Sequence, residues 1–230
     1  MNVTAEVPDS ASGERPAPWT STVTVAFTGA SGMPYGLRLV EALIQARVRV
    51  YLIYSQAAQI VARQELDLAL PARASETAAL LGTRYGAAPG QLVGFGREEW
   101  FAPVASGSNP PDAMVICPCS MGTLAAIAAG LSDNLIERAA DVVLKEGRRL
   151  ILVPRETPFS ALHLENMLRL ARLGAVILPP SPAFYHHPKS IADLVDFVVA
   201  RVLDQLRVVH SLGPRWGEAR PDASERRETD

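Results

Sequence analysis

The sequence predicts one α/β domain built on an open, doubly wound parallel sheet. Short apolar runs alternate with helix-like segments along the chain, and the runs lack the polar–apolar alternation of a strand with one wet face. Such runs are typical of parallel strands that helices cover on both sides. Repeated strand–helix units favour a doubly wound sheet, which binds ligands at the carboxyl ends of its strands. The expected strands are residues 22–28, 48–54, 113–117, 150–153 and 175–178.

End signals mark the helices between these strands. Ser160 can cap a helix that stops at Gly174, because serine is a common N-cap and glycine a common helix stop. Ser190 and Asp193 form a variant of the capping box at the start of the last helix. Further helices are expected over 34–46, from 56, over 75–85, and from Asp133 or Asn134 to near Gly147.

One irregular stretch and two polar ends complete the organisation. Residues 67–111 show the least regular pattern and end in a Pro/Gly/Ser-rich loop over 102–111, and a long loop of this kind often covers an active site. Residues 1–20 and 217–230 have too few apolar side chains to repay ordering, so we expect tails there. Between these tails we expect a single domain over residues 21–216.

Composition narrows the function classes. The chain has 230 residues and a net charge of −2, with 22 basic and 24 acidic residues, so charge gives no case for binding nucleic acid or an anionic membrane. The N-terminus lacks the apolar core of a signal peptide, and no run approaches the roughly 18 apolar residues of a membrane span. The two cysteines are separated by a single residue, so a disulfide between them could not link distant parts of the fold. We therefore expect a soluble, cytoplasmic protein.

The first motif is Thr-Gly-Ala-Ser-Gly-Met-Pro-Tyr-Gly at 28–36, where the first strand turns into a helix. Glycines let the backbone approach a phosphate, and the helix start offers free N–H groups and a positive dipole end. A dinucleotide site would need an acidic residue at the end of the second strand. That strand ends instead in Tyr54, Ser55 and Gln56, which suits a mononucleotide better; a ligand-free tight turn is the simpler alternative.

The second motif is Cys-Pro-Cys-Ser-Met-Gly-Thr at 117–123, again a strand end that leads into a helix. Ser120, Gly122 and Thr123 can donate hydrogen bonds, so this turn and the first are expected to form one crevice. Cys117 and Cys119 make a poor zinc site without further ligands. We expect Cys117 to be buried and Cys119 to lie in the pocket wall.

Charged and aromatic residues form the third and fourth groups. Arg138 and Lys145 are seven residues apart and share a helix face, while Arg201 lies on the last helix. Such cations usually belong to a solvated surface, but the pair 155–156, Arg-Glu, follows the fourth strand where ligands of this fold bind. The segment 184–190, Phe-Tyr-His-His-Pro-Lys-Ser, follows the fifth strand and offers a tyrosine hydroxyl; its histidines are interpreted as ordinary loop residues.

Together these motifs resemble the flavin prenyltransferase family (UbiX-like). The resemblance rests on Thr-Gly-Ala-Ser-Gly at 28–32, Ile-Cys-Pro-Cys-Ser-Met-Gly-Thr at 116–123 and Asn-Leu-Ile-Glu-Arg-Ala-Ala-Asp at 134–141. It also rests on Val-Pro-Arg-Glu-Thr-Pro-Phe at 153–159, His-Leu-Glu-Asn-Met at 163–167, Leu-Gly-Ala-Val-Ile-Leu-Pro at 173–179 and Phe-Tyr-His at 184–186. It covers nearly everything from residue 22 to about 216.

The resemblance implies a flavodoxin-like, Rossmann-like sheet, a dodecamer with sites at subunit junctions, and no metal. It implies reduced FMN and dimethylallyl monophosphate as substrates, and prenylated FMN as a product used by a UbiD-type decarboxylase. The residues implied to hold FMN are Gly29, Ala30, Ser31, Ser55, Trp100, Ser106, Ser120, Met121, Gly122, Thr123 and Arg138. The residues implied around the prenyl phosphate and the acid–base chemistry are Glu65, Lys145, Arg155, Glu156, Tyr185 and Arg201, with Trp216 as a closing residue.

Two alternatives come from other function classes. An FMN-dependent decarboxylase of the related cysteine-decarboxylase fold group would share the sheet and the flavin site, although Arg155, Glu156 and Tyr185 together favour a prenyl-phosphate substrate. A non-catalytic flavin carrier would need the Gly/Ser turns but no cluster of Lys145, Glu156 and Arg201. Whether the product serves ubiquinone synthesis or aromatic acid breakdown stays open.

Overall fold

The computed structural model describes residues 19–213 and residue 217, and within them six strands form one sheet. The strands are β1 (Thr22–Phe27), β2 (Arg49–Tyr54), β3 (Leu92–Gly94), β4 (Ala113–Cys119), β5 (Arg149–Pro154) and β6 (Val176–Ile177). Their order is β3-β2-β1-β4-β5-β6, and every neighbouring pair is parallel. The doubly wound parallel sheet predicted from the sequence is confirmed.

The order of the strands places a topological switch between β1 and β4. From β1 the chain winds outward through β2 to β3, and it then returns to β4 and winds the other way through β5 to β6. Because the connections leave β1 and β4 in opposite directions, their carboxyl ends flank an opening where ligands of this architecture bind. The two phosphate-ready turns of the sequence both lie at this opening.

Strand β3 corrects the sequence-based expectation of five strands. It lies inside the segment expected to be irregular and pairs with β2, Val50 opposite Leu92 and Leu52 opposite Gly94. A strand of three residues is too short to show a period, so only its partner strand reveals it. The expected strand at 113–117 also continues to Cys119.

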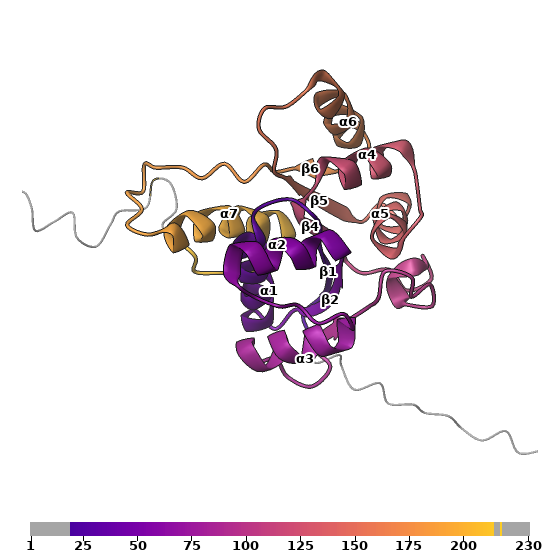
Figure 1. Ribbon diagram of the computed structural model, residues 1–230, viewed down its shortest axis with the longest axis horizontal. Helices are drawn as coiled ribbons and strands as arrows, with labels where there is room; N and C mark the ends of the chain where they lie inside the picture. The colour runs from indigo at the N-terminus through magenta and orange to yellow at the C-terminus, as the bar shows by residue number, and fades with distance from the viewer. Residues whose placement is uncertain (1–18, 214–216, 218–230) are drawn as a thin grey trace, which may run out of the picture.

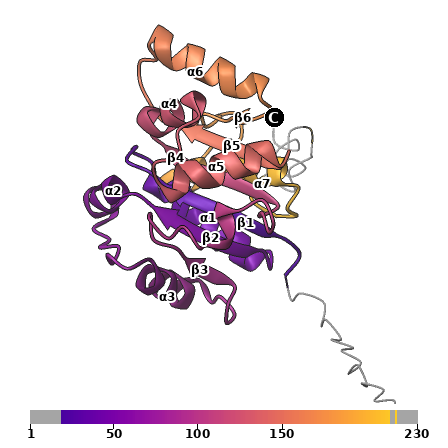
Figure 2. The ribbon, with the colours of Figure 1, turned by 90° about the vertical axis from the view of Figure 1, so that its right-hand side faces the viewer.

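Seven α-helices and one short 3-10 helix accompany the sheet in the described part of the chain. They are α1 (Met33–Gln45), α2 (Gln56–Leu66), α3 (Ala74–Tyr85), η1 (Pro103–Ala105), α4 (Met121–Ala129), α5 (Leu135–Lys145), α6 (Ala161–Arg172) and α7 (Ile191–Leu206). Helices α1, α2, α3 and α7 share one core with the sheet, and α4, α5 and α6 share the other. Figures 1 and 2 show α3 at one end of the sheet and α6 at the other.

The two cores explain why the strands are apolar without alternation. Val115 and Cys117 of β4 point into the α1–α7 core, whereas Met114 and Ile116 between them point into the α4–α6 core. All four side chains are at most 1% exposed. No helix of the described residues is long and apolar enough to cross a membrane.

The expected helix caps are present. Ser160 accepts a hydrogen bond from the N–H of His163, and Ser190 and Asp193 form the predicted capping box at the start of α7. Of the two candidates before α5, Asn134 is the N-cap, and its side chain accepts from the N–H groups of Ile136 and Glu137.

Replacing Gly36 of α1 tests how closely this helix packs on the sheet. A Cβ there would lie 2.4 Å from the carbonyl oxygen of Cys117 and 2.7 Å from Cε1 of Phe27. We expect Gly36→Ala to lower the free energy of unfolding by roughly 1–3 kcal/mol, measured by urea denaturation, because the helix must shift. The control is Gly82→Ala in α3, where the Cβ would lie 3.7 Å from Ala87, and it should add up to about 1 kcal/mol. A Gly36→Ala protein as stable as the control would contradict this packing.

Candidate functional site

One buried hydroxyl joins the two turns at the switch point. Thr28 follows β1 and is 1% exposed. Its Oγ1 donates to the carbonyl oxygen of Pro118 at 2.8 Å and accepts from the N–H of Ser120 at 2.7 Å. Its own N–H also donates to Pro118, at 3.2 Å. The 28–32 turn and the 118–120 turn are therefore fixed side by side, and the single crevice expected at them stays a prediction.

The turn after β4 opens α4 with an accessible first turn. Ser120 is the N-cap: its Oγ accepts from the N–H of Thr123 at 3.3 Å and donates to the Thr123 hydroxyl at 3.0 Å. Met121 is buried behind this turn, whereas Gly122 is exposed, and a Cβ on Gly122 would meet no atom within 4 Å. A helix start carries partial positive charge and unpaired N–H groups, so this open turn can receive an anion.

The turn after β1 is tightly packed on its inner side. A Cβ at Gly29 would lie 2.6 Å from Cβ of Ala57 in α2, so only glycine fits there. Ala30 is buried, and Ser31 is exposed at the mouth of the turn. Ser55 caps α2 by accepting from the N–H of Ala58 at 3.1 Å, and so brings a third helix start to the same edge of the sheet.

Glu65 changes the expectation that the start of α1 is free. Its carboxylate accepts from the N–H of Gly32 at 3.0 and 3.1 Å and from the N–H of Met33 at 2.8 Å. The positive end of α1 attracts this carboxylate as it would attract a phosphate. An anion bound at this turn therefore meets the residues before Gly32, not the N–H groups of Gly32 and Met33.

Arg155 and Glu156 extend this edge beyond β5. The backbone N–H of Arg155 donates to the carbonyl oxygen of Cys119 at 3.3 Å, which places Arg155 beside the turn after β4. Its Nε is buried and has no hydrogen-bond partner among the described residues. Glu156 Oε1 accepts from the N–H of Thr157 at 3.2 Å. A buried guanidinium nitrogen without a protein partner suits an anionic ligand.

The two cysteines are structural. Cys117 is buried as expected, and Cys119, expected in the pocket wall, is fully buried in the α4–α6 core. Burial raises the pKa of the Cys119 thiol to about 12 and raises the pKa of Cys117 as well, because a thiolate loses its hydration there. Neither sulfur is a thiolate near neutral pH, and no three metal-ligating side chains gather anywhere in the part of the chain the structure describes.

Arg138, Lys145 and the 105–107 loop form a second group along α5. Arg138 Nε donates to the carbonyl oxygen of Ala105 at 2.9 Å, and its Nη1 donates to Asp141 at 2.8 Å. Lys145 pairs with Glu146, and a Cβ on Gly107 would lie 2.7 Å from Lys145 Nζ. The loop expected to cover the site thus packs against α5. Ser106 of this loop is exposed, and Trp100, which precedes the loop in the sequence, is 45% exposed.

The direction of α5 separates Lys145 from the crevice within one chain. The helix starts at the carboxyl edge of the sheet and runs back, and β5 begins four residues after Lys145, at Arg149. Seven residues of helix span about 10 Å, so Arg138 and Lys145 lie that far apart along the axis. One chain therefore does not bring Lys145 to the turns after β1 and β4.

Tyr185 and Arg201 line one cavity of about 670 Å³. The segment between β6 and α7 extends away from the sheet before it turns into α7 (Figure 1). Phe197 of α7 packs against this segment. Its ring meets the Tyr185 ring edge-on, with the ring centroids 6.0 Å apart, and stacks on the His186 ring, with the centroids 5.3 Å apart. Both residues thus line one cavity, and the hypothesis that they face one anion stays a prediction.

Sequence reasoning missed the role of Thr28. The glycine turn begins with this residue, and a hydroxyl residue at a strand end directly before glycine is a usable signal of such a role. Trp216, expected to close the site, lies outside the described residues, as do nearly all residues of the two expected tails.

Comparison with known proteins places these features in a family. Residues 15–203 match the Flavoprotein family. The chain is 59% identical over 196 residues to the flavin prenyltransferase UbiX of Pseudomonas aeruginosa, covering 85% of this chain and 94% of that protein. It is 47% identical over 195 residues to the flavin prenyltransferase UbiX of Methanocaldococcus jannaschii, covering 85% and 98%.

Two solved structures are similar over most of the chain. AnUbiX (PadA1), in complex with FMN and dimethylallyl pyrophosphate, has a TM-score of 0.77 and 41% identity, covering 87% of this chain and 99% of that one. A dodecameric FMN-dependent UbiX-like decarboxylase from Escherichia coli O157:H7 has a TM-score of 0.75 and 44% identity, covering 86% and 100%.

Replacing Thr28 tests whether its hydroxyl organises the crevice. Thr28→Val keeps the shape but leaves the Ser120 N–H and the Pro118 carbonyl without this partner. We expect it to weaken FMN binding roughly tenfold or more, measured by flavin fluorescence titration, while Thr28→Ser binds nearly as wild type. The control is Thr24→Val on the same strand, because the buried Thr24 hydroxyl has no hydrogen-bond partner among the described residues. Equal FMN affinity in the Thr28→Val and Thr24→Val proteins would contradict the role of Thr28.

Proposed function

This chain belongs to the flavin prenyltransferase (UbiX) family, and from that premise we propose that it joins the dimethylallyl group of dimethylallyl monophosphate to N5 and C6 of reduced FMN. Phosphate leaves, and the prenylated FMN passes to a UbiD-type decarboxylase. The observation that carries the proposal is that two separate places hold groups able to bind an anion. One is the crevice of turns at β1 and β4, and the other is the cavity lined by Tyr185 and Arg201.

FMN is proposed to occupy the crevice. The residues given this role are Gly29, Ala30, Ser31, Ser55, Ser120, Met121, Gly122 and Thr123 at the three helix starts, with Trp100, Ser106 and Arg138 from the loop and α5. The open first turn of α4 and the exposed hydroxyl of Ser31 support a phosphate there, because a helix start stabilises negative charge. The missing acidic residue at the end of β2 argues against a dinucleotide.

The prenyl donor needs its leaving phosphate stabilised. As the bond from the allylic carbon to the flavin N5 forms, the carbon–oxygen bond breaks and phosphate takes the electron pair. Lys145, Arg155 and Arg201 are proposed to hold this anion, with the Tyr185 hydroxyl as a neutral donor. The buried Arg155 Nε supports this role, since it lacks a partner among the described residues.

N5 loses its proton as it is alkylated. Ring closure then joins C6 to one carbon of the prenyl double bond, while the other carbon of that bond takes up a proton and C6 releases one. A carboxylate or the departed phosphate must carry these protons. Glu156, beside Arg155, is the proposed acceptor. Glu65, near the end of α2, is proposed to act at the same site. Its carboxylate lies at the start of α1, where the N–H groups of Gly32 and Met33 hold it.

A second copy of the chain is proposed to complete the site. Lys145 lies away from the crevice of its own chain, so it can act on a ligand there only from a neighbouring subunit. Large apolar side chains are left exposed, among them Phe101 at 104%, Leu162 at 62% and Phe184 at 69%. The dodecameric relative from E. coli supports a homo-oligomer of that size.

We propose further that the protein works in the cytoplasm, without metal, nucleic acid or membrane, and that its product serves either ubiquinone biosynthesis or aromatic acid breakdown. The alternative chemistry is FMN-dependent decarboxylation, and the non-catalytic alternative is a flavin carrier. The carrier gives the Tyr185–Arg201 cavity no anion-binding role, and Arg155, Glu156 and Tyr185 together favour a prenyl phosphate over the substrate of a decarboxylase.

Incubating the protein with reduced FMN and dimethylallyl monophosphate tests the reaction directly. We expect a reduced flavin product heavier than reduced FMN by one C5H8 unit, detected by mass spectrometry, and equal turnover in EDTA because no metal is needed. Dimethylallyl pyrophosphate in place of the monophosphate should react more slowly. Unchanged flavin would favour the decarboxylase or the carrier, and activity lost in EDTA and restored by Mg²⁺ would contradict the metal-free mechanism.

The cavity residues separate a transferase from a carrier. Tyr185→Phe and Arg201→Ala should each raise the KM for dimethylallyl monophosphate roughly tenfold to a hundredfold, because each removes a hydrogen bond to a charged group. FMN affinity should stay nearly unchanged. Arg73→Ala is the control, since it removes an arginine whose side chain is 81% exposed beside α3. Loss of FMN binding in the two cavity variants would show that the anion sites are misassigned.

A further inference from the structure

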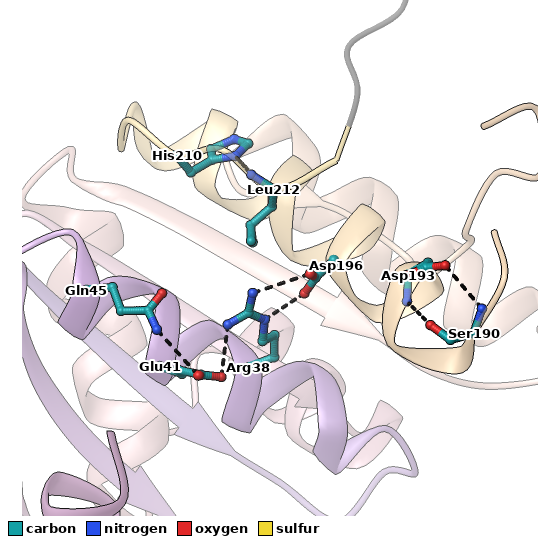
Figure 3. Close-up of polar contacts among 8 residues, drawn as sticks. All are labelled: Arg38, Glu41, Gln45, Ser190, Asp193, Asp196, His210 and Leu212. Carbon is teal, nitrogen blue, oxygen red and sulfur yellow. Dashed lines mark hydrogen bonds and ion pairs between the residues drawn. The ribbon is translucent and has the colours of Figure 1, made fainter. Parts of the chain in front are cut away.

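Three aspartates line the cavity that contains Tyr185 and Arg201. Figure 3 shows the contacts of Asp193 with Ser190 and of Asp196 with Arg38. Asp193 accepts from the N–H groups of Lys189 at 2.7 Å and Ser190 at 3.1 Å, so it belongs to the cap of α7. Asp196 accepts from Arg38 of α1 at 2.6 and 3.3 Å, so it fixes α7 on α1. The third aspartate is Asp204.

Asp204 connects Arg201 with His210. One oxygen, Oδ2, accepts from Arg201 Nη1 at 2.6 Å, one helical turn earlier. The other oxygen, Oδ1, lies 3.2 Å from His210 Nε2. Both carboxylate oxygens are thus engaged, and Arg201 and His210 both line the cavity. The Asp204 side chain is 24% exposed and the Arg201 side chain 54%, so water screens the pair mainly from the arginine side.

The hydrogen bonds of His210 fix which nitrogen carries the proton. The backbone N–H of Leu212 donates to His210 Nδ1 at 3.2 Å, so Nδ1 is an acceptor and carries no proton (Figure 3). Nε2 therefore carries the proton and donates to Asp204. With 8% of its side chain exposed, His210 is a nearly buried donor in a fixed orientation. It holds Asp204 from the side opposite to Arg201.

We propose that Asp204 is a positioning residue for the prenyl-phosphate site. It fixes the Arg201 guanidinium in the cavity wall, and it ties the 208–213 segment over the cavity through His210. This inference rests on the proposed function, since it assigns the cavity to the phosphate of the prenyl donor. A free arginine samples many rotamers, and a carboxylate that restrains it lowers the entropy lost when an anion binds.

The test is binding of dimethylallyl monophosphate to the FMN-loaded protein, measured by calorimetry. Asp204→Ala should weaken this binding about tenfold and leave FMN affinity unchanged, because a contacting pair couples strongly. Glu76→Gln is the matched control: Glu76 pairs with Arg73 at the same i, i+3 spacing, on α3 and away from the cavity. Asp204→Asn, which keeps an oxygen for His210 but loses the charge, guards against a folding defect of the alanine variant.

A double-mutant cycle separates positioning from a general structural effect. If Asp204 acts through Arg201, Asp204→Ala should cost nothing further in an Arg201→Ala protein. Equal, additive losses in both backgrounds would overturn the proposal. Wild-type affinity of Asp204→Ala would overturn it while leaving the transferase function intact, provided that the wild-type protein forms prenylated flavin. A wild-type protein that binds no dimethylallyl monophosphate would overturn both.

Discussion

The geometry of the crevice depends on the hydroxyl of Thr28. The backbone pairing of β1 with β4 ends at Ala26 opposite Ile116, so the two chains part just before their turns. This makes room for a ligand and leaves one backbone hydrogen bond between the turns, from the Thr28 N–H to the Pro118 carbonyl oxygen at 3.2 Å. Oγ1 of Thr28 adds two more, because it bonds both a carbonyl and an N–H of the 118–120 turn. A hydroxyl suits this position since it both donates and accepts, and its burial excludes competing water.

The helices that start at the carboxyl edge of the sheet differ in what lies against their positive N-terminal ends. The starts of α1 and α7 are neutralised by carboxylates of the chain, Glu65 at α1 and Asp193 at α7. Hydrogen bonds from the Lys189 N–H, and then from Ser190, hold the pKa of Asp193 below its usual range. Its stabilising contribution is therefore present above the unfolded pKa of an aspartate and is lost as pH falls through the lower folded value. The start of α4 has only the Ser120 cap and faces open space at Gly122, which leaves its positive end for a ligand.

The antiparallel course of the covering helices limits what one chain can assemble. A helix that starts at the carboxyl edge carries its later residues away from that edge at about 1.5 Å per residue. Arg138 in the second turn of α5 can lie near the edge, but Lys145 at the end of α5 cannot. Arg201 lies in the third turn of α7 or beyond and meets the returning 208–213 segment instead. For this reason, the proposed site with all of these cations would need a neighbouring copy.

The sequence by itself determined the parallel sheet, the helix caps and the two turns, because these depend on local pattern: apolar strands without alternation, Ser160 and Ser190 before helices, glycines at strand ends. The shared cavity of Tyr185 and Arg201 was within reach because both belong to one short connection and its helix. Only the tertiary structure revealed β3, which forms by pairing with β2. Only the tertiary structure also showed that the carboxylate of Glu65 binds the N–H groups at the start of α1. It also decided the role of Thr28, which bonds residues 90 and 92 positions away. The role of Asp204 depends on the turn after α7, which brings a histidine six positions later back to the helix. Contacts between distant segments follow from how the layers pack, and a local pattern does not encode them.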